Sequence, residues 1–237
     1  YRAQVRNITR HIIIVACCLL VWLGCHMPAM AQPRLNMPPI STGAPGGVTG
    51  SMMYWNPRVV GTQDLMGTAL LGGNGGLVFR YMEHKVCALQ IELNYIQRGW
   101  RETDEASAVA YSRTLDCIQL PLLTHLYFGK KSFRGFFNLG PQISYCINER
   151  ESGTKHPTYT AQYAPIDHPF DWGLAAGLGC YIHTPKAGIY QLEARFNYSL
   201  SDTFSNSKMA YFSSSHAMVA SVNFAYLFEI KVKKKKR

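Results

Sequence analysis

The chain has 237 residues, of which 47% are hydrophobic and only 16% are charged, and it contains 14 tyrosines and 11 phenylalanines. This composition excludes a disordered chain, which would be rich in charge and poor in aromatic residues, and no heptad pattern supports a coiled coil. The net charge of +10 arises from basic residues at the two ends of a nearly neutral chain, so we predict no nucleic-acid partner.

Residues 1–31 have the features of a signal peptide. Arg2, Arg6 and Arg10 precede an apolar run over residues 11–24, and Ala29-Met30-Ala31 fits a cleavage site. The run is shorter than the ~20 residues of a membrane-spanning helix. A lipoprotein signal ending at Cys25 is the alternative, and both interpretations predict export. Residues 32–45 are rich in proline and predict a loose leader, and residues 231–237 form a basic tail.

Residues 46–230 alternate between apolar and polar side chains with a period of two, which is typical of strands. The clearest segment is 87–95, where Cys, Leu, Ile, Leu and Tyr occupy the odd positions. The predicted strands are 46–55, 75–82, 87–99, 114–128, 133–147, 170–182, 188–200 and 218–230. Several reach the ~9–11 residues needed to cross a bilayer at a tilt. We expect the glycine-rich segment 72–76 to be a flexible loop before the second strand.

The connections between these strands are alternately long and short. Such a pattern is typical of outer-membrane barrels, whose turns are short on the periplasmic side and long outside. We therefore predict an all-β fold: an eight-stranded antiparallel up-and-down transmembrane β-barrel in the cell outer membrane, preceded by a signal peptide.

Alternation alone does not decide which face points outward. A soluble periplasmic barrel would enclose the apolar face around a ligand. We favour the apolar face outward because its aromatic residues lie near strand ends, as in membrane-interface girdles, and because the opposite face suits a narrow polar interior. The candidate network in the lumen comprises Arg80, Gln90, Glu92, Asn94, His125, Gln142, Glu193, Arg195 and Asn197. We interpret it as a salt-bridged plug, and an ion-selecting constriction is the alternative.

Four blocks of the sequence carry a family resemblance. They are Leu93-Asn-Tyr-Ile-Gln-Arg-Gly99, Leu120-Pro-Leu-Leu-Thr-His-Leu-Tyr-Phe-Gly129, Phe136-Phe-Asn-Leu-Gly-Pro-Gln142 and Leu192-Glu-Ala-Arg-Phe-Asn-Tyr-Ser199. Together they resemble the porin-family, PorT-like outer-membrane β-barrel proteins of Bacteroidetes-type bacteria. The resemblance implies an eight-stranded barrel in the outer membrane of a Gram-negative cell. One namesake of the family assists a protein-secretion system.

No catalytic, cofactor or metal motif is present in the sequence. We therefore predict a non-enzymatic barrel that contacts outer-membrane lipid and acts as a scaffold or partner of envelope or secretion proteins. The alternatives are a narrow, porin-like channel and a barrel enzyme that acts on lipid through His125. The body contains Cys87, Cys117, Cys146 and Cys180, whose spacing matches no metal-binding or redox motif. One disulfide among them is possible if the compartment is oxidising.

Overall fold

A computed structural model describes residues 40–57, 68–82, 87–104, 109–129, 132–155, 166, 168–184, 187–201 and 212–230. The predicted signal peptide, residues 32–39 and the basic tail lie outside these ranges. Within them, no helix is long and apolar enough to cross a membrane.

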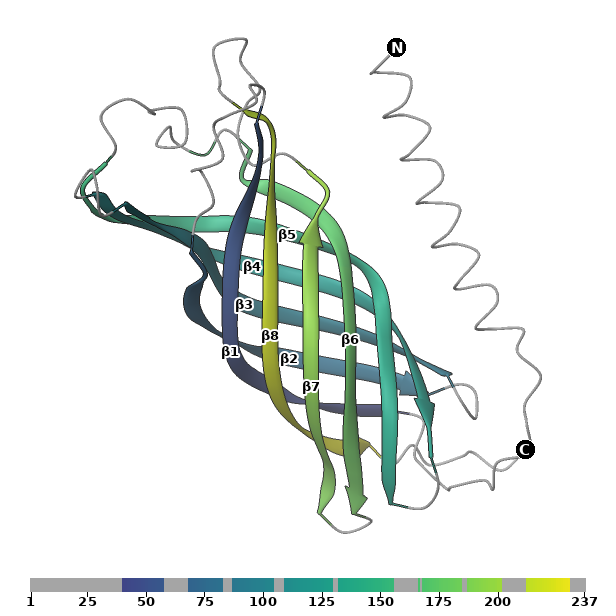
Figure 1. The fold of residues 1–237 in the computed structure, drawn as a ribbon. Helices are drawn as coiled ribbons and strands as arrows, with labels where there is room; N and C mark the ends of the chain where they lie inside the picture. The colour runs from purple at the N-terminus through teal and green to yellow at the C-terminus, as the bar shows by residue number, and fades with distance from the viewer. Residues whose placement is uncertain are drawn as a thin grey trace, which may run out of the picture.

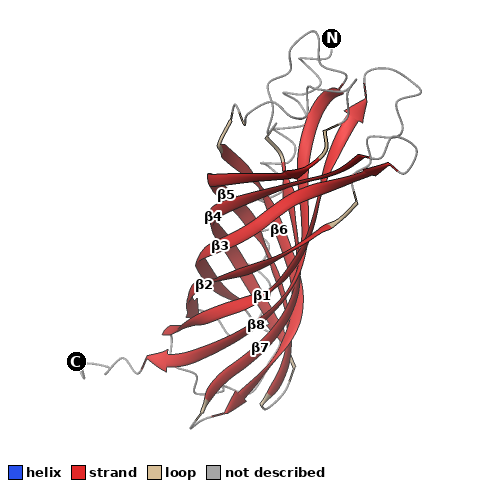
Figure 2. Cartoon of the chain, turned by 90° about the vertical axis from the view of Figure 1, so that its left-hand side faces the viewer, coloured by secondary structure: helices blue, strands red, loops and turns tan. Residues whose placement is uncertain are grey.

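Eight antiparallel strands follow one another around a closed barrel, and β1 pairs with β8 to complete the ring (Figures 1 and 2). This arrangement confirms the predicted fold. The strands are β1 (Ile40–Pro57), β2 (Leu70–Met82), β3 (Cys87–Asp104), β4 (Val109–Phe128), β5 (Phe133–Gly153), β6 (Phe170–Thr184), β7 (Gly188–Ser199) and β8 (Phe212–Ile230). Closure leaves no sheet edge in the wall, so the backbone groups there can pair with one another instead of facing lipid.

The first strand begins earlier than the sequence predicted. Residues 40–45, which we assigned to the proline-rich leader, form the start of β1. Pro45 has no N–H to donate, and pairing with β2 is interrupted at Ala44 and Pro45 while pairing with β8 continues through both. Proline is therefore tolerated here because the strand keeps one complete neighbour.

The glycine-rich segment 72–76 is part of β2 and is not the loop that we expected. Its residues pair with residues 46–49 of β1, including Gly46 opposite Gly75. A strand ladder is built from backbone groups alone, so a segment without large side chains can still pair when both neighbours are in place.

Six strands, β1 to β5 and β8, extend beyond their predicted bounds at the end of the barrel that carries the long connections. Beyond the pair Tyr145 and Phe170, β5 has no further ladder with β6. The ladder between β2 and β3 ends at Ile96, and Thr68, just before β2, forms an isolated bridge with Arg101. Residues 97–104, 109–116 and 147–153 thus continue as a three-stranded sheet, which we call the β3–β5 extension. Because of it, only residues 105–108 separate β3 from β4.

Candidate functional site in the lumen

Inward and outward positions alternate along the strands of the barrel wall, and the polar face points inward. On β7, for example, Gln191, Glu193 and Arg195 are buried, whereas Leu192 and Phe196 are exposed. All nine residues of the predicted network are buried. The apolar face is therefore the outward one, as expected for a membrane barrel rather than for a soluble ligand barrel.

The centre of the lumen is occupied by an ion cluster around Arg195. Its Nη1 and Nη2 donate to the two carboxylate oxygens of Glu92 at 2.6 and 2.7 Å, and its Nε and Nη2 donate to Glu193 at 2.9 Å each. Arg195 and Glu193 lie on β7, but Glu92 lies on β3, which is not a neighbour of β7 in the ring. The cluster therefore crosses the lumen from one wall to the other.

Amide side chains complete the coordination of the two carboxylates. Gln90 donates to Glu92 at 2.5 Å, and Asn94 donates to it at 2.7 Å. Gln191 donates to Glu193 at 3.1 Å. A buried ion cluster is tolerated when its remaining hydrogen-bonding positions are filled in this way, so these amides are what allow the charges to remain in the interior.

A second arginine extends the cluster toward the short-turn end. Arg80 of β2 donates through Nε to Gln90 at 2.8 Å and through Nη2 to Gln191 at 2.5 Å. It thus joins the β3 and β7 sides of the lumen through neutral amides. The cluster contains two arginines and two glutamates, so it carries no net formal charge.

His125 joins the cluster through Asn138. The Nδ1 atom of His125 lies 2.6 Å from Oδ1 of Asn138, whose Nδ2 donates to Glu193 at 2.9 Å. The imidazole packs against the ring of Phe136 with centroids 4.8 Å apart. Within the described residues, His125 has no hydrogen bond to a serine or a glutamate, and Asn138 is its hydrogen-bond partner.

Two predicted members lie apart from this cluster. Gln142 accepts a hydrogen bond from Gln119 at 2.9 Å. Asn197 is buried, and its Oδ1 has no hydrogen-bond partner within the described residues. Conversely, Gln191 and Asn138 belong to the cluster although the sequence analysis did not select them; their inward position in the alternation is the signal that would have identified them.

The sequence analysis also missed a second ionic site nearer the long-loop end. Arg98 of β3 donates to Asp171 of β6 at 2.5 Å, again between strands that are not neighbours. Asp171 also accepts a hydrogen bond from Ser144 at 3.1 Å, and from Ser199 and Ser201. Each of the two charged residues lies an even number of positions from the inward residues of its strand. Alternation would therefore have placed both in the lumen.

Apolar side chains fill the lumen above and below these ionic sites. Toward the long-loop end, Trp100, Tyr111 and Leu115 pack with residues of β1 and β8. Toward the short-turn end, Tyr127, Phe136 and Tyr181 form a second cluster with apolar residues of β2, β7 and β8, among them Leu227. Apolar clusters therefore lie on both sides of the polar middle of the lumen, together with buried charged residues such as Arg113 and Arg134. The sequence analysis anticipated only the polar part.

The outward surface carries an apolar band between two aromatic belts. Tyr81, Phe128, Phe133, Tyr190 and Phe228 lie near the short-turn ends of their strands, and all are exposed. A second set near the other end of the wall includes Tyr54, Tyr95, Tyr145 and Phe170. Leucine, isoleucine and valine predominate between them, as in a lipid-facing barrel wall.

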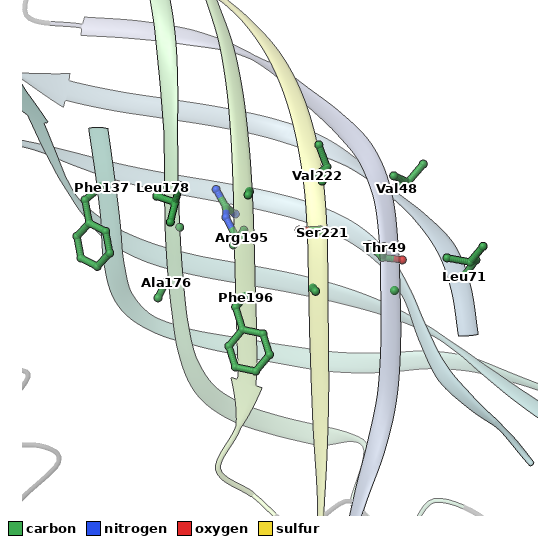
Figure 3. A pocket seen from close by; sticks show the side chains of 14 residues that line it. Val48, Thr49, Leu71, Phe137, Ala176, Leu178, Arg195, Phe196, Ser221 and Val222 are labelled. Carbon is green, nitrogen blue, oxygen red and sulfur yellow. The ribbon is translucent and has the colours of Figure 1, made fainter. Parts of the chain in front are cut away.

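Small residues make a hollow in this band. Gly50, Ala176, Ala194 and Ala220 lie between larger side chains that include Phe137, Leu178, Phe196 and Val222, and the hollow has a volume of about 540 Å³ (Figure 3). Its lining is almost entirely apolar. Within the described residues, no group of histidine, cysteine, aspartate and glutamate side chains is arranged to hold a metal ion.

Comparison with known proteins agrees with this architecture. Residues 31–205 match the family described as outer membrane protein beta-barrel domain. The fold is similar to OprG of Pseudomonas aeruginosa, with a TM-score of 0.51 and 14% identity over 82% of this chain and 98% of that chain. Ail of Yersinia pestis has a TM-score of 0.40 and 12% identity over 79% of this chain and 98% of that chain. OmpW of E. coli has a TM-score of 0.36 and 14% identity over 82% of this chain and 100% of that chain. No curated protein matches the sequence.

Proposed function

Because the chain belongs to the outer membrane protein β-barrel domain family, it is an outer-membrane protein, and we propose that it is a closed, non-enzymatic anchor that presents the β3–β5 extension to a protein partner. The observation that carries this proposal is the contact of Arg195 with Glu92 across the lumen. An eight-stranded barrel has an interior only wide enough for side chains, and here paired charges occupy its middle.

The packing at both ends of the lumen supports a closed barrel. Trp100 and Leu115 are fully buried at the long-loop end, and Leu227 is fully buried at the short-turn end. A solute on this path would have to displace apolar side chains at each end and break the ion cluster between them. The narrow channel and the ion-selecting constriction are therefore less well supported.

Among the described residues, charged and exposed groups suited to recognition lie on the β3–β5 extension. Glu149 and Arg150 on β5 are exposed there, beyond the aromatic belt at Tyr145. Arg150 pairs with Asp116 at 2.8 Å, and Glu149 pairs with Arg113 at 2.6 Å. In barrels of this class the long-loop end faces the outside of the cell. A sheet with charged, ordered side chains at that position suits the recognition of a protein.

We assign the partner to the cell envelope, on the basis of the family resemblance to PorT-like proteins noted above. A component of a protein-secretion system is the specific candidate. The enzyme alternative has less support, because nucleophilic catalysis requires a nucleophile within hydrogen-bonding reach of its base and His125 is held by Asn138 inside the barrel.

Conductance tests whether the barrel is closed. The full chain, refolded into a planar lipid bilayer, is expected to show no discrete current steps over the applied voltage range. Steady single-channel currents in the wild-type protein would overturn the proposal and establish the narrow channel in its place.

Site-specific photo-cross-linking in the native outer membrane tests the presentation of the extension. A photoreactive residue at Arg150 is expected to give a discrete adduct with an envelope protein, which mass spectrometry identifies. The matched control is the same residue at Leu192, on the lipid-facing wall, where no such adduct is expected. The absence of a protein adduct at Arg150, or equal adducts at both positions, would contradict a partner bound at the extension.

A further inference from the structure

Two of the four cysteines in the barrel face one another inside it. Cys117 of β4 and Cys146 of β5 are direct register partners, and their sulfurs lie 2.7 Å apart. The register between the strands shifts at Asp116 and Cys117, which is the signature of a bulge that changes where a side chain points. Because of this shift, Cys117 is opposite Cys146, while Asp116 is opposite Asn148.

The positions of these two residues suit a covalent link. Residues directly opposite in an antiparallel pair have Cα atoms ~4.5–5.5 Å apart, and disulfides span Cα separations of ~4.4–6.8 Å. The two ranges overlap, so a register pair whose sulfurs lie 2.7 Å apart suits a disulfide. Cys117 is fully buried, with Leu115 and Ile96 in the same apolar cluster.

The other two described cysteines of the barrel lie on strands that are not joined to each other. Cys87 lies on β3 opposite Leu126, and Cys180 lies on β6 opposite Gly135 and Leu192. Strands β3 and β6 are not neighbours in the ring, and both residues occupy positions in the outward register. The register thus distinguishes the pair of Cys117 and Cys146 from the remaining described cysteines.

We infer that Cys117 and Cys146 are joined by a disulfide in the mature protein. The Sγ–Sγ bond forms as the two thiols together lose two protons and two electrons. A thiol–disulfide oxidant of the cell envelope accepts them, and its own disulfide is reduced to two thiols. An outer-membrane protein passes through the periplasm, a compartment in which disulfides form and persist.

The bond would lie where the extension leaves the wall. Tyr145 is the last residue of β5 in its ladder with β6, and Cys146 follows it directly. The N–H of Cys146 still donates to the carbonyl of Pro169, next to β6, at 2.9 Å. From Ile147 outward, β5 has a ladder within the described residues only with β4. The disulfide would therefore tie the last strand of the extension to its one ladder neighbour, at the level where support from β6 ends.

Peptide mapping of the wild-type protein tests the inference without any substitution. The full chain is exported, extracted from membranes in N-ethylmaleimide without reductant, digested and analysed by mass spectrometry. The expected result is a linked pair of peptides containing Cys117 and Cys146 that separates on reduction, with Cys87 and Cys180 alkylated. Quantitative alkylation of Cys117 and Cys146, or a link from either of them to another cysteine, would overturn the inference.

Matched variants place the bond. Cys117→Ser and Cys146→Ser are each expected to remove the linked pair and to leave the other cysteine alkylated. Cys87→Ser is expected to leave the linked pair unchanged. A linked pair that is lost equally in Cys87→Ser would contradict the assignment.

Discussion

Arg195 on β7 donates two parallel hydrogen bonds, of 2.6 and 2.7 Å, to the carboxylate of Glu92 on the far wall of the barrel. Bidentate pairing of this kind fixes both the distance and the orientation of the two groups. It therefore acts as a strut between β3 and β7, which share no backbone hydrogen bonds. The stability of the barrel should depend on this strut more than on any exposed ion pair.

Arg195→Met is expected to destabilise the folded barrel by about 3–5 kcal/mol, because it leaves two buried carboxylates without their cation. The triple variant Arg195→Met, Glu92→Gln, Glu193→Gln removes the unpaired charge and should recover much of the loss. The free energy of unfolding of the single and the triple variant is measured by urea titration in lipid vesicles. The folded fraction is read from the mobility of unheated samples on gels. A triple variant that is less stable than the single one would show that the destabilisation does not come from unpaired charge.

Gly177→Ala is expected to destabilise the barrel by about 1–3 kcal/mol, the usual cost of overpacking. A Cβ atom at Gly177 would lie 2.2 Å from Oε1 of Glu193, and that oxygen is held in place by Asn138 and Arg195. Gly50 is the control, since a Cβ atom there meets no atom within 4 Å. The comparison is made by urea titration, and equal stability of the Gly177→Ala and Gly50→Ala proteins would count against a rigid cluster.

Leu192→Arg is expected to cost about 2–4 kcal/mol, the penalty for arginine facing the middle of a bilayer. Leu192 is exposed near the centre of β7. Ile147→Arg makes the same type of change at an exposed position in the β3–β5 extension, and there we expect about 0–1 kcal/mol. Folding yields into vesicles and unfolding titrations test the contrast. If both positions tolerate arginine equally well, Leu192 does not face lipid.

Asp171→Ala is expected to lower stability by about 3–5 kcal/mol, because Arg98 then remains buried without a counter-ion. Ser144→Ala removes one neutral donor to the same carboxylate and should cost about 1 kcal/mol. The temperature at which half of the protein loses its folded mobility on gels gives the order of the two variants. A larger loss in Ser144→Ala would mean that the ion pair does not dominate this site.

Alternation in the sequence was sufficient to predict the eight strands, because a lipid-facing wall requires apolar side chains at every second residue. The outward face was predicted from a further signal, the aromatic residues near strand ends. It failed where that requirement ends. In the β3–β5 extension the outer side meets water, so residues such as Asn148 and Glu149 break the pattern although the strand continues. The glycines at 72–76 carry no side-chain signal, and their strand forms because β1 and β3 lie on both sides of it.

The candidate site was only partly accessible from sequence. Parity along each strand identifies which residues face the lumen, and Glu92 and Arg195 were selected on that basis. It does not reveal which inward residues meet, because contacts across the lumen depend on the tilt and stagger of the strands. For the same reason, the pairing of Arg98 with Asp171, 73 positions apart in the chain, was not anticipated.

The seam between β1 and β8 joins residue 40 to residue 230 and continues along both strands. β1, the first strand of the wall to be synthesised, can therefore pair with β8 only after β8, the last strand, has been made. Until then the molecule is an open sheet with two unsatisfied edges, which lipid cannot accommodate. Assembly must accordingly be completed from a fully exported chain, and an accessory factor that shields those edges would have to recognise backbone rather than side chains.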